Sequence, residues 1–280
     1  MFDVFSVLSE VRSRKPLVHH ITNWVTVYDC AQVTRSAGAL PVMAHAPEEV
    51  EEMVSLAGAL VLNIGTLSSS LVESMVLAGQ KANDLSIPVV LDAVGAGATK
   101  FRSRECFELI DKVKFAVVKG NSSEVGTLAG AGALTRGVEA ESVEGSLSEL
   151  ARELAVSKNC TVVVTGAEDI VSDGERTVVV RNGHELMGRV VGTGCMAASL
   201  LGAFNAVEGD SLKASACALA AFGVAGEIAA TKANEPSKFK AELLDSLYVL
   251  REESLRKARI EEMNLDSDLN PKNVRPEENG

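Results

Sequence analysis

The stretch PVVLDAVG, residues 88–95, decides the fold class. It is a run of apolar, mostly β-branched residues that is too short for a helix and leads into an aspartate and a glycine. Related runs recur at ALVLNIG (59–65), FAVVKGN (115–121) and TVVVTGA (161–167). Because none of these runs alternates apolar with polar residues, they predict central strands of a sheet that is buried on both faces.

Helical segments separate these runs, which predicts βαβ units and an α/β fold with a mostly parallel central sheet flanked by helices on both faces. PLVHHITN (16–23) and LPVMAHAP (40–47) predict two further extended segments. Asp-Gly between two valine-rich pieces predicts an antiparallel hairpin around residues 170–181. The predicted helices are residues 4–13, a helix from about Trp24, a helix opened by Pro47, and residues 68–85, 195–207, 211–232 and 237–260.

Charge and composition exclude two classes of function. The chain has 280 residues and a net charge of -11, which argues against sequence-independent nucleic-acid binding because that needs a basic surface. We find no run of about 18 uncharged apolar residues, so we expect no membrane span. Without an internal repeat or linker, we expect one domain, residues 1–262, followed by a polar tail, residues 263–280, that is disordered.

The cysteines and the N-terminus indicate a cytoplasmic protein. The five cysteines are far apart and form no C-x-x-C pair, which predicts free thiols in a reducing compartment and no zinc site. The first 15 residues lack the pattern of a signal peptide. These cysteines are Cys30, Cys106, Cys160, Cys195 and Cys217.

Polar and glycine-rich motifs follow four of the predicted strands. In an open parallel sheet the carboxyl ends of the strands share one edge, where ligands bind. Any one of these motifs is more simply a turn, but four together favour a binding site. The motifs begin at Asn63, Asp92, Lys119 and Thr165.

Two carboxylates stand out at this edge. Asp92 ends a strand, and Glu124 follows Asn121 by three residues, which is also the spacing of a helix capping box. Carboxylate oxygens suit Mg²⁺, which keeps several waters. Both interpretations stay open for Glu124, since the helix start that it caps can also place it near a phosphate.

VVGTGCMAASLLGAF, residues 190–204, predicts a turn that opens a buried helix. The amides of Gly192, Thr193 and Gly194 at such a helix start can receive a phosphate charge. Cys195 in the first turn is a candidate proton acceptor, because a helix N-terminus lowers a thiol pKa. The alternative for a free cysteine is a small buried hydrophobe, and we assign the other four to it.

Seven segments together resemble the hydroxyethylthiazole kinase family, within the ribokinase-like superfamily. The resemblance covers roughly residues 15–230 in register, and PVMAHAPEE and GTGC are its most diagnostic parts. Most kinases of that superfamily carry Asp where this family has Cys. The segments are HHITN, PVMAHAPEEVEEMV, LVLNIGTLS, VVLDAVGAGAT, VKGNSSE, VVVTGAEDIVSDGER and GTGC.

The resemblance implies a ribokinase-like fold and an enzyme that uses ATP to phosphorylate the primary alcohol of 4-methyl-5-(2-hydroxyethyl)thiazole in thiamine biosynthesis or salvage. It implies Cys195 as the catalytic base, with the amides of residues 192–194 as the anion hole. It further implies a homotrimer with sites between subunits. The other implied roles are Mg²⁺ binding by Asp92 and Glu124, ATP binding by Lys119 and Thr165, and substrate binding by Met43, Gly192 and, more weakly, Asn23.

The sequence departs from the family at positions that affect the predicted substrate more than phosphoryl transfer. HHITN replaces HNITN, Leu40 and Ala93 replace the Ser and Pro of ASPVM and DPVG, and Asp29 and Gln32 stand where Asn is common. Another ribokinase-like enzyme remains an alternative, such as a hydroxymethylpyrimidine kinase or a nicotinamide-nucleotide-hydrate dehydratase, although the dehydratase is expected to carry Asp at Cys195. The second alternative is a nucleotide-binding regulator that has lost catalytic activity.

Overall fold

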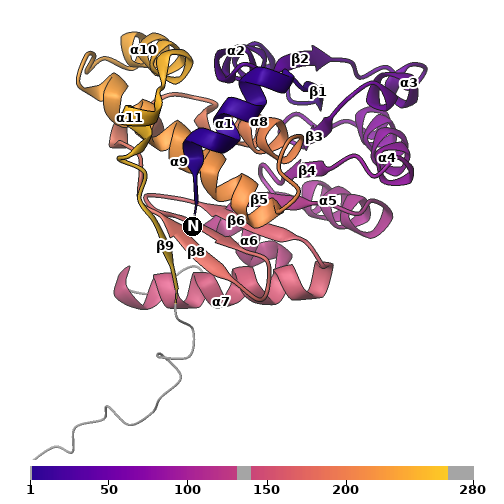
Figure 1. The fold of residues 1–280 in the computed structure, drawn as a ribbon. Coiled ribbons are helices and arrows are strands. Elements are labelled where there is room, and N and C mark those ends of the chain that lie inside the picture. Colours follow the sequence, from indigo (N-terminus) through magenta and orange to yellow (C-terminus); the bar gives the residue numbers. More distant parts are fainter. Residues whose placement is uncertain (1, 131–139, 264–280) are drawn as a thin grey trace, which may run out of the picture.

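A nine-stranded mixed sheet forms the centre of the protein. We describe residues 2–130 and 140–263 of a computed structural model (Figure 1). The strand order is β2-β1-β3-β4-β5-β6-β7-β8-β9, parallel from β2 to β6 and antiparallel from β6 to β9. The strands are β1 (Leu17–Ile21), β2 (Leu40–Met43), β3 (Ala59–Asn63), β4 (Val89–Asp92), β5 (Val117–Asn121), β6 (Thr161–Thr165), β7 (Asp169–Ser172), β8 (Thr177–Val180) and β9 (Ile260–Glu262).

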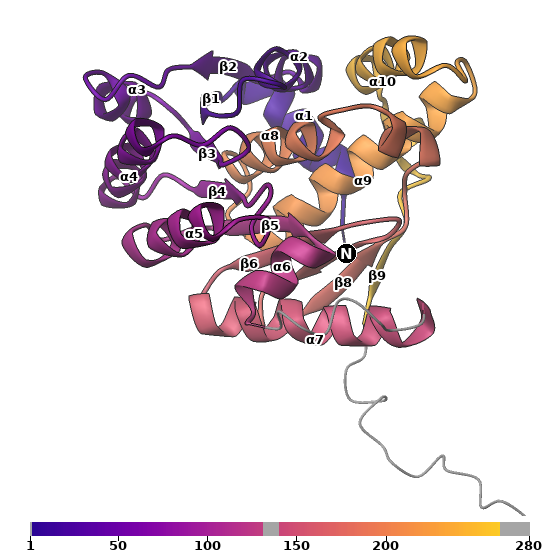
Figure 2. The same cartoon turned by 180° about the vertical axis from the view of Figure 1, so that it is seen from behind.

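Helices cover both faces of this sheet, as Figures 1 and 2 show. Helices α8 and α9 pack on one face, with α1, α2 and α10 outside them, while α4, α6 and α7 pack on the other face. The helices are α1 (Val4–Arg14), α2 (Val27–Ala37), α3 (Val50–Ser55), α4 (Ser69–Asp84), α5 (Lys100–Lys112), α6 (Ser122–Leu128), α7 (Ala140–Lys158), α8 (Thr193–Asn205), α9 (Ser211–Ala230), α10 (Pro236–Val249) and α11 (Glu252–Leu255), with a 3₁₀ turn, η2, at Glu185–Arg189.

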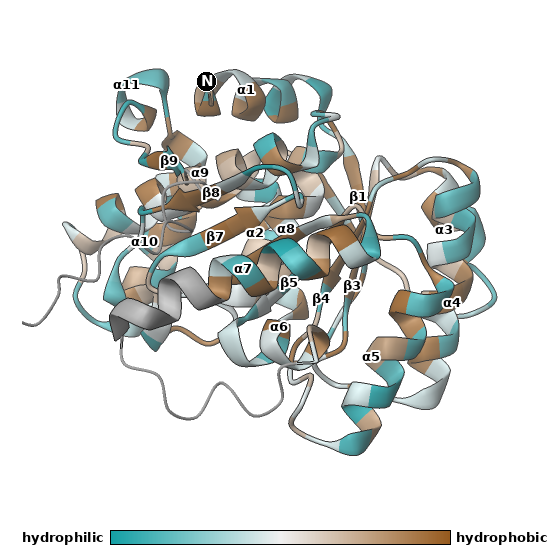
Figure 3. Ribbon diagram, turned by 90° about the horizontal axis from the view of Figure 1, so that it is seen from below, coloured by the Kyte–Doolittle hydropathy of each residue, from teal (hydrophilic) through white to brown (hydrophobic). Residues whose placement is uncertain are grey.

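Alternate residues of each central strand enter two separate hydrophobic cores. In β3, Val61 belongs to the core beneath α8 and α9, whereas Leu60 and Leu62 belong to the core beneath α4. Successive strand residues point to opposite faces, so a strand covered on both faces must be apolar throughout. In Figure 3 the strands are mostly hydrophobic, while the helices around them carry both hydrophobic and hydrophilic segments. The predicted α/β class with a mostly parallel sheet is confirmed.

The antiparallel end of the sheet confirms one prediction and corrects another. β7 and β8 form the predicted hairpin. The helix predicted over residues 237–260 is too long, because α10 ends at Val249 and the chain continues as α11 and the edge strand β9. The Arg12 guanidinium of α1 donates hydrogen bonds to the carbonyls of Leu247, Tyr248 and Leu250 at 2.6–3.0 Å. These bonds satisfy the carbonyls that a helix end leaves free.

Two other helices begin later than their sequence signals predict. α2 begins at Val27 rather than near Trp24, and α3 at Val50, three residues after Pro47. Helix α9 is long and apolar enough to span a membrane, but 83% of its most apolar window is buried inside the protein, as in a core helix. The predicted polar tail lies, except for Met263, outside the described residues.

Candidate active site

The register of the parallel strands aligns three polar side chains in one row. Asn63 ends β3 and pairs with Asp92 of β4, which pairs in turn with Lys119 of β5. Each stands two residues after a valine of the core beneath α8, namely Val61, Val90 and Val117. Because side chains two apart share a face, all three point towards α8. The row therefore lies at the carboxyl edge of the sheet, where the sequence predicted a site.

Asp92 holds the centre of this row through two short contacts. Its Oδ1 accepts a hydrogen bond from Lys119 Nζ at 2.9 Å, and its Oδ2 accepts one from Asn63 Nδ2 at 2.6 Å. Burial raises the pKa of Asp92, and Lys119 opposes that shift. Burial alone would lower the pKa of Lys119, but the charge and hydrogen bond of Asp92 raise it above its ordinary value. Lys119 thus keeps a positive charge in a buried place, which suits it to an anionic ligand.

Cys195 meets this row from the first turn of α8. Its Sγ accepts hydrogen bonds from Asn63 Nδ2 at 3.3 Å and Asn23 Nδ2 at 3.4 Å. The predicted lowering of its pKa is wrong: burial raises the pKa of the Cys195 thiol, and the charge of Asp92 raises it further. These effects outweigh the lowering of the thiol pKa by the helix N-terminus, because the thiol is enclosed and faces a carboxylate. Cys195 is accordingly a neutral thiol at neutral pH.

Gly192 makes the turn into α8 in a left-handed conformation, with φ of +95°. A β-carbon at this position would lie 2.6 Å from the Thr26 methyl group, so only glycine fits. The first hydrogen bond within α8 runs from the Met196 amide to the Gly192 carbonyl, so the amides of residues 193–195 precede it. A β-carbon on Gly194 would lie 3.1 Å from Lys119 Nζ. The helix start and the lysine therefore face the same space.

Glu124 forms the capping box that its spacing indicated. Its Oε2 accepts a hydrogen bond from the Asn121 amide at 2.7 Å, while the Asn121 side chain accepts one from the Glu124 amide at 2.9 Å. Its Oε1 accepts a hydrogen bond from the Gly95 amide at 2.8 Å, which ties the loop after β4 to the start of α6. Glu124 is therefore a structural residue, and its carboxylate also faces Asp92 and Lys119 closely enough to affect their pKa values.

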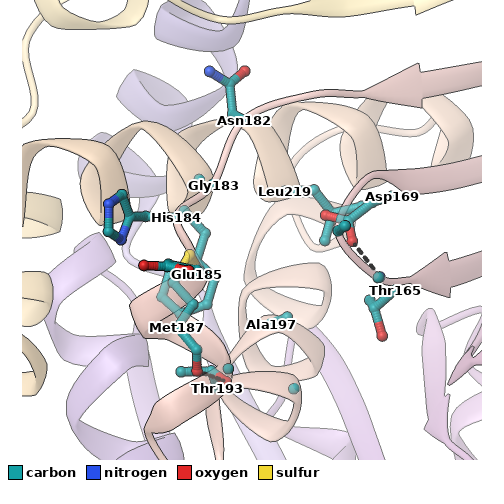
Figure 4. Close-up of a pocket in the computed structure, with 16 residues that line it drawn as sticks. Thr165, Asp169, Asn182, Gly183, His184, Glu185, Met187, Thr193, Ala197 and Leu219 are labelled. Carbon is teal, nitrogen blue, oxygen red and sulfur yellow. Dashed lines mark hydrogen bonds between the residues drawn. The ribbon is translucent and has the colours of Figure 1, made fainter. Parts of the chain in front are cut away.

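Beside the start of α8 lies a pocket of about 530 Å³ (Figure 4). Thr193 and Gly194 line one end, and Thr165 and Asp169 line another part. Gly183, His184 and Met187 with α9 form other walls, which gives a partly apolar cleft next to backbone amides. The lining residues are Thr165, Gly166, Ala167, Asp169, Asn182, Gly183, His184, Glu185, Met187, Gly188, Thr193, Gly194, Ala197, Leu219, Phe222 and Gly223.

Of the two other predicted substrate residues, Asn23 contacts Cys195 and Asn63, whereas Met43 lies on a more distant strand of the sheet and its role stays a prediction. Asn23 is buried and contacts Cys195 and Asn63. Met43 ends the outermost parallel strand, β2, paired with His20 and separated from β3 by β1. His19 and His20, which the sequence reading left out, are buried with ring nitrogens bonded to the backbone carbonyls of Ala44 and Val18.

The structure shows the surroundings of four residues that depart from the family pattern. The Ala93 amide donates a hydrogen bond to the Lys119 carbonyl at 2.9 Å, which a proline cannot do. Asp29 forms an ion pair of 2.5 Å with Lys240 of α10 and lies beside the turn at Gly192. The Gln32 side-chain amide donates a hydrogen bond to the Tyr28 hydroxyl, and both residues lie on α2. Leu40 is partly exposed on β2.

Sequence reasoning did not assign a role to Asn63 or Thr26. Asn63 contacts Asp92, Cys195 and Asn23, and Thr26 donates to Asn23 Oδ1 through both its amide and its hydroxyl. A polar residue that ends an apolar strand was the available signal for Asn63. Thr26 carried no such signal, because its position depends on how the loop before α2 folds over Gly192.

The carboxylates fit Mg²⁺ in a limited way. Among the described residues, no group of three or more His, Cys, Asp or Glu side chains could enclose a metal ion. Asp92 and Glu124 already accept protein hydrogen bonds on all four oxygens, and each oxygen keeps a second lone pair. Mg²⁺ is commonly held by one or two carboxylates with water and phosphate oxygens completing the shell. The donor set fits that mode.

Comparison with known proteins identifies the family. The profile of the "Hydroxyethylthiazole kinase family" matches residues 8–253. A protein named hydroxyethylthiazole kinase from Methanosarcina acetivorans is 53% identical over 249 residues, covering 89% of this chain and 95% of that protein. One of the same name from Methanocella arvoryzae is 55% identical over 244 residues, covering 87% and 92%.

Solved structures agree with the sequence comparison. A hydroxyethylthiazole kinase protein from Pyrococcus horikoshii has a TM-score of 0.88 and 48% identity, covering 94% of this chain and 100% of that chain. A Staphylococcus aureus pyridoxal kinase in complex with ADP has a TM-score of 0.60 and 15% identity, covering 76% and 88%, and shows likeness of fold alone. The predicted ribokinase-like fold is thereby confirmed, and the chain belongs to the hydroxyethylthiazole kinase family.

Proposed function

We propose that this enzyme transfers the γ-phosphoryl group of ATP to the primary alcohol of 4-methyl-5-(2-hydroxyethyl)thiazole, in thiamine biosynthesis or salvage. One observation carries the proposal. In a chain of this family, Lys119, Asp92 and Cys195 meet the amides at the start of α8, beside a pocket of about 530 Å³. Phosphoryl transfer needs positive charge and aligned donors more than covalent chemistry, and this edge of the sheet supplies both.

In the proposed reaction, the alcohol oxygen bonds to the γ-phosphorus while the bond from that phosphorus to the β–γ bridging oxygen breaks, and ADP leaves. The amides of residues 192–194 receive the charge on the transferring group. Lys119, held next to Gly194, adds a positive charge at the same place. The hydroxyl proton passes to Cys195 Sγ. Because burial raises the pKa of this thiol, only a small thiolate fraction accepts the proton, which makes Cys195 a weak base.

The nucleotide is proposed to occupy the pocket along α9. Leu219, Phe222 and Met187 offer apolar surface to a base, and Thr165 offers a hydroxyl. Gly223 lets α9 approach closely, since a β-carbon there would lie 2.5 Å from the Asn182 carbonyl oxygen. The triphosphate would then point towards Gly194 and Lys119.

Asp92 and Glu124 are proposed to hold Mg²⁺, mainly through water. When bound, the ion would neutralise phosphate charge. The chain itself keeps the two carboxylates in place, Asp92 through Asn63 and Lys119, and Glu124 through the amides of Asn121 and Gly95.

We further propose a homotrimer whose thiazole site is completed between subunits. Support comes from the exposed apolar residues before and within α2, where Trp24 is 55%, Val25 69% and Tyr28 69% exposed. Met43, the predicted substrate contact, lies on the outermost strand of the parallel part of the sheet. Light scattering after gel filtration gives the mass of the assembly. A monomer that is fully active would exclude shared sites.

We also propose one kinase domain over residues 1–262 in the cytoplasm. A single sheet runs from β1 to β9, which ends at Glu262, and all five cysteines are unpaired and buried, which fits a reducing compartment.

The function is tested by mass spectrometry of the product. The enzyme is incubated with Mg-ATP and the thiazole alcohol, and we expect a thiazole that has gained one phosphoryl group. Hydroxymethylpyrimidine serves as the second acceptor. Phosphorylation of the pyrimidine instead would favour the other kinase, and no product from a folded protein would contradict the proposal.

A further inference from the structure

Asn63 lies between the two side chains on which the proposed reaction depends. Its Nδ2 is 2.6 Å from Asp92 Oδ2 and 3.3 Å from Cys195 Sγ. We propose that Asn63 is a positioning residue, which holds the Asp92 carboxylate and the Cys195 thiol in a fixed relation during phosphoryl transfer. The inference rests on the proposed function, and it adds a residue to which neither the family resemblance nor the sequence analysis gave a role.

The orientation of the Asn63 amide is fixed by partners that can act in one way only. Its Oδ1 accepts a hydrogen bond from the Gly65 amide at 2.9 Å, and a backbone N–H is only a donor. Its Nδ2 faces the Asp92 carboxylate, and an ionised carboxylate is only an acceptor. A flipped amide would place oxygen against oxygen and N–H against N–H. The protons of Nδ2 must therefore point at Asp92 and Cys195.

This arrangement uses the hydrogen-bonding capacity of the amide in full. The two Nδ2 protons serve two acceptors, while Oδ1 receives the Gly65 amide and Asn23 Nδ2, the latter at 3.0 Å. Only 1% of Asn63 is exposed, so water does not compete for these bonds. In a buried network whose members are all satisfied, each side chain keeps one position.

The position matters because two negative charges would meet there. Before the hydroxyl proton is transferred, the thiolate that will accept it lies on one side of the Asn63 amide and the Asp92 carboxylate on the other, at 3.3 Å and 2.6 Å from Nδ2. The two N–H groups of Asn63 lie between the sulfur and the carboxylate and donate to both. Such preset donors stabilise both negative charges without having to reorient, and the charge on sulfur is removed when the thiolate takes the proton.

Asn63→Asp removes this donation at nearly constant side-chain size and places a second carboxyl group beside Asp92. An aspartate keeps an oxygen for the Gly65 amide and for Asn23, but it loses both donors to Asp92 and Cys195. Asn83→Asp is the matched control. Asn83 also accepts from a backbone amide, that of Lys114, and donates to a backbone carbonyl, both at 2.8 Å, but at an exposed place away from the site.

For each variant we would measure kcat and KM for the thiazole alcohol, the affinity for a non-hydrolysable ATP analogue by calorimetry, and thermal unfolding. We expect Asn63→Asp to lower kcat by on the order of 100-fold, the scale of a disturbed general base. We expect KM and the nucleotide affinity to stay within about threefold, because uniform binding is not removed. Asn83→Asp should match the parent in kcat, KM and nucleotide affinity, although it loses the hydrogen bond to the Lys114 carbonyl.

A double-mutant cycle with Cys195→Ala separates positioning from a general structural role. If Asn63 acts through the thiol, Asn63→Asp should lower kcat at least about fivefold less in the Cys195→Ala background than in the parent. An equal loss in both backgrounds, a loss confined to KM or nucleotide affinity, or a kcat within about threefold of the parent would each overturn the proposal. If Asn63→Asp does not fold, Asn63→Ser takes its place in every measurement, since a hydroxyl has one proton and cannot serve both acceptors.

A parent enzyme without turnover would instead contradict the proposed function. Without turnover, the nucleotide affinities could not support the positioning role of Asn63, because that role predicts no change in affinity. Failure of the positioning role and failure of the kinase function are therefore distinguishable.

Discussion

Replacing Gly192 by alanine tests the anion hole through a single methyl group. Gly192 has φ of +95°, and a β-carbon there would lie 2.6 Å from Thr26 Cγ2 and 3.2 Å from Thr26 Cβ. A left-handed conformation costs an L-residue about 1–2 kcal/mol. The methyl contact is about 1 Å shorter than the 3.5–4.0 Å that carbon atoms prefer. Overpacking of this kind costs about 1–3 kcal/mol. The two costs sum to roughly 2–5 kcal/mol of unfolding free energy.

The protein can relieve part of this cost by moving the turn, which would displace the amides of residues 193 and 194. A misplacement of about 1 Å can lower a rate by 10²-fold. We therefore expect Gly192→Ala to lower kcat by on the order of 100-fold and the melting temperature by at least about 4 °C, at about 2–4 °C per kcal/mol.

The assays are coupled ADP release with Mg-ATP and the thiazole alcohol, and thermal unfolding by circular dichroism. Gly209→Ala is the control, because a β-carbon at Gly209 meets nothing within 4 Å and its φ is not in the left-handed region. We expect that variant to match the parent or to gain a little stability. If Gly192→Ala kept both the kcat and the melting temperature of Gly209→Ala, the reasoning on this turn would be refuted.

Three further predictions concern the side chains around the turn. Cys195→Ala should lower kcat by on the order of 10²-fold with little change in KM. Cys195→Asp should stay active or improve, because a carboxylate is ionised where the thiol is not. An alanine variant as fast as the parent would disprove the assignment of Cys195 as the base. Glu124→Ala should lower activity mainly at low Mg²⁺ concentration. Loss of the helix cap should also cost about 0.5–2 kcal/mol of unfolding free energy. If the Mg²⁺ dependence of activity were unchanged, capping α6 would be the only role of Glu124. Burial raises the pKa of Asp169 to about 6, so folding binds a proton between the unfolded pKa near 4 and pH 6, and stability falls as the pH rises through that window. Asp169→Asn keeps the acceptor for the Gly166 amide. At pH 7 its unfolding free energy should exceed that of the parent by up to about 3 kcal/mol, and at pH 4 the two proteins should be equally stable. A stability difference that is the same at both pH values would refute this account.

The sequence predicted the sheet well because burial on both faces leaves a direct mark on the residues. The runs containing Val61, Val90 and Val117 had to be apolar throughout, since alternate side chains enter two cores. The hairpin was also local, because Asp-Gly lies in the turn itself. The end of α10 was not predictable in this way, since it depends on Arg12, which comes from the other end of the chain.

The same division applies to the candidate site. Asp92, Lys119 and Thr165 were found because each follows an apolar run, and parallel register then brings their strand ends to one edge. The raised pKa of Cys195 was missed, because it follows from the Asp92 charge and from burial that only the folded chain creates. The role of Met43 stays a prediction, as the strand that carries it lies at the margin of the sheet.

The most direct test of the central claim is the rate of ADP release with Mg-ATP and each of two acceptors, the hydroxyethylthiazole and hydroxymethylpyrimidine. The account predicts turnover with the thiazole alcohol, none above background with the pyrimidine, and a kcat lower by on the order of 10²-fold in Cys195→Ala. Turnover with the pyrimidine alone, or with neither acceptor in a protein that is folded and binds ATP, would contradict it.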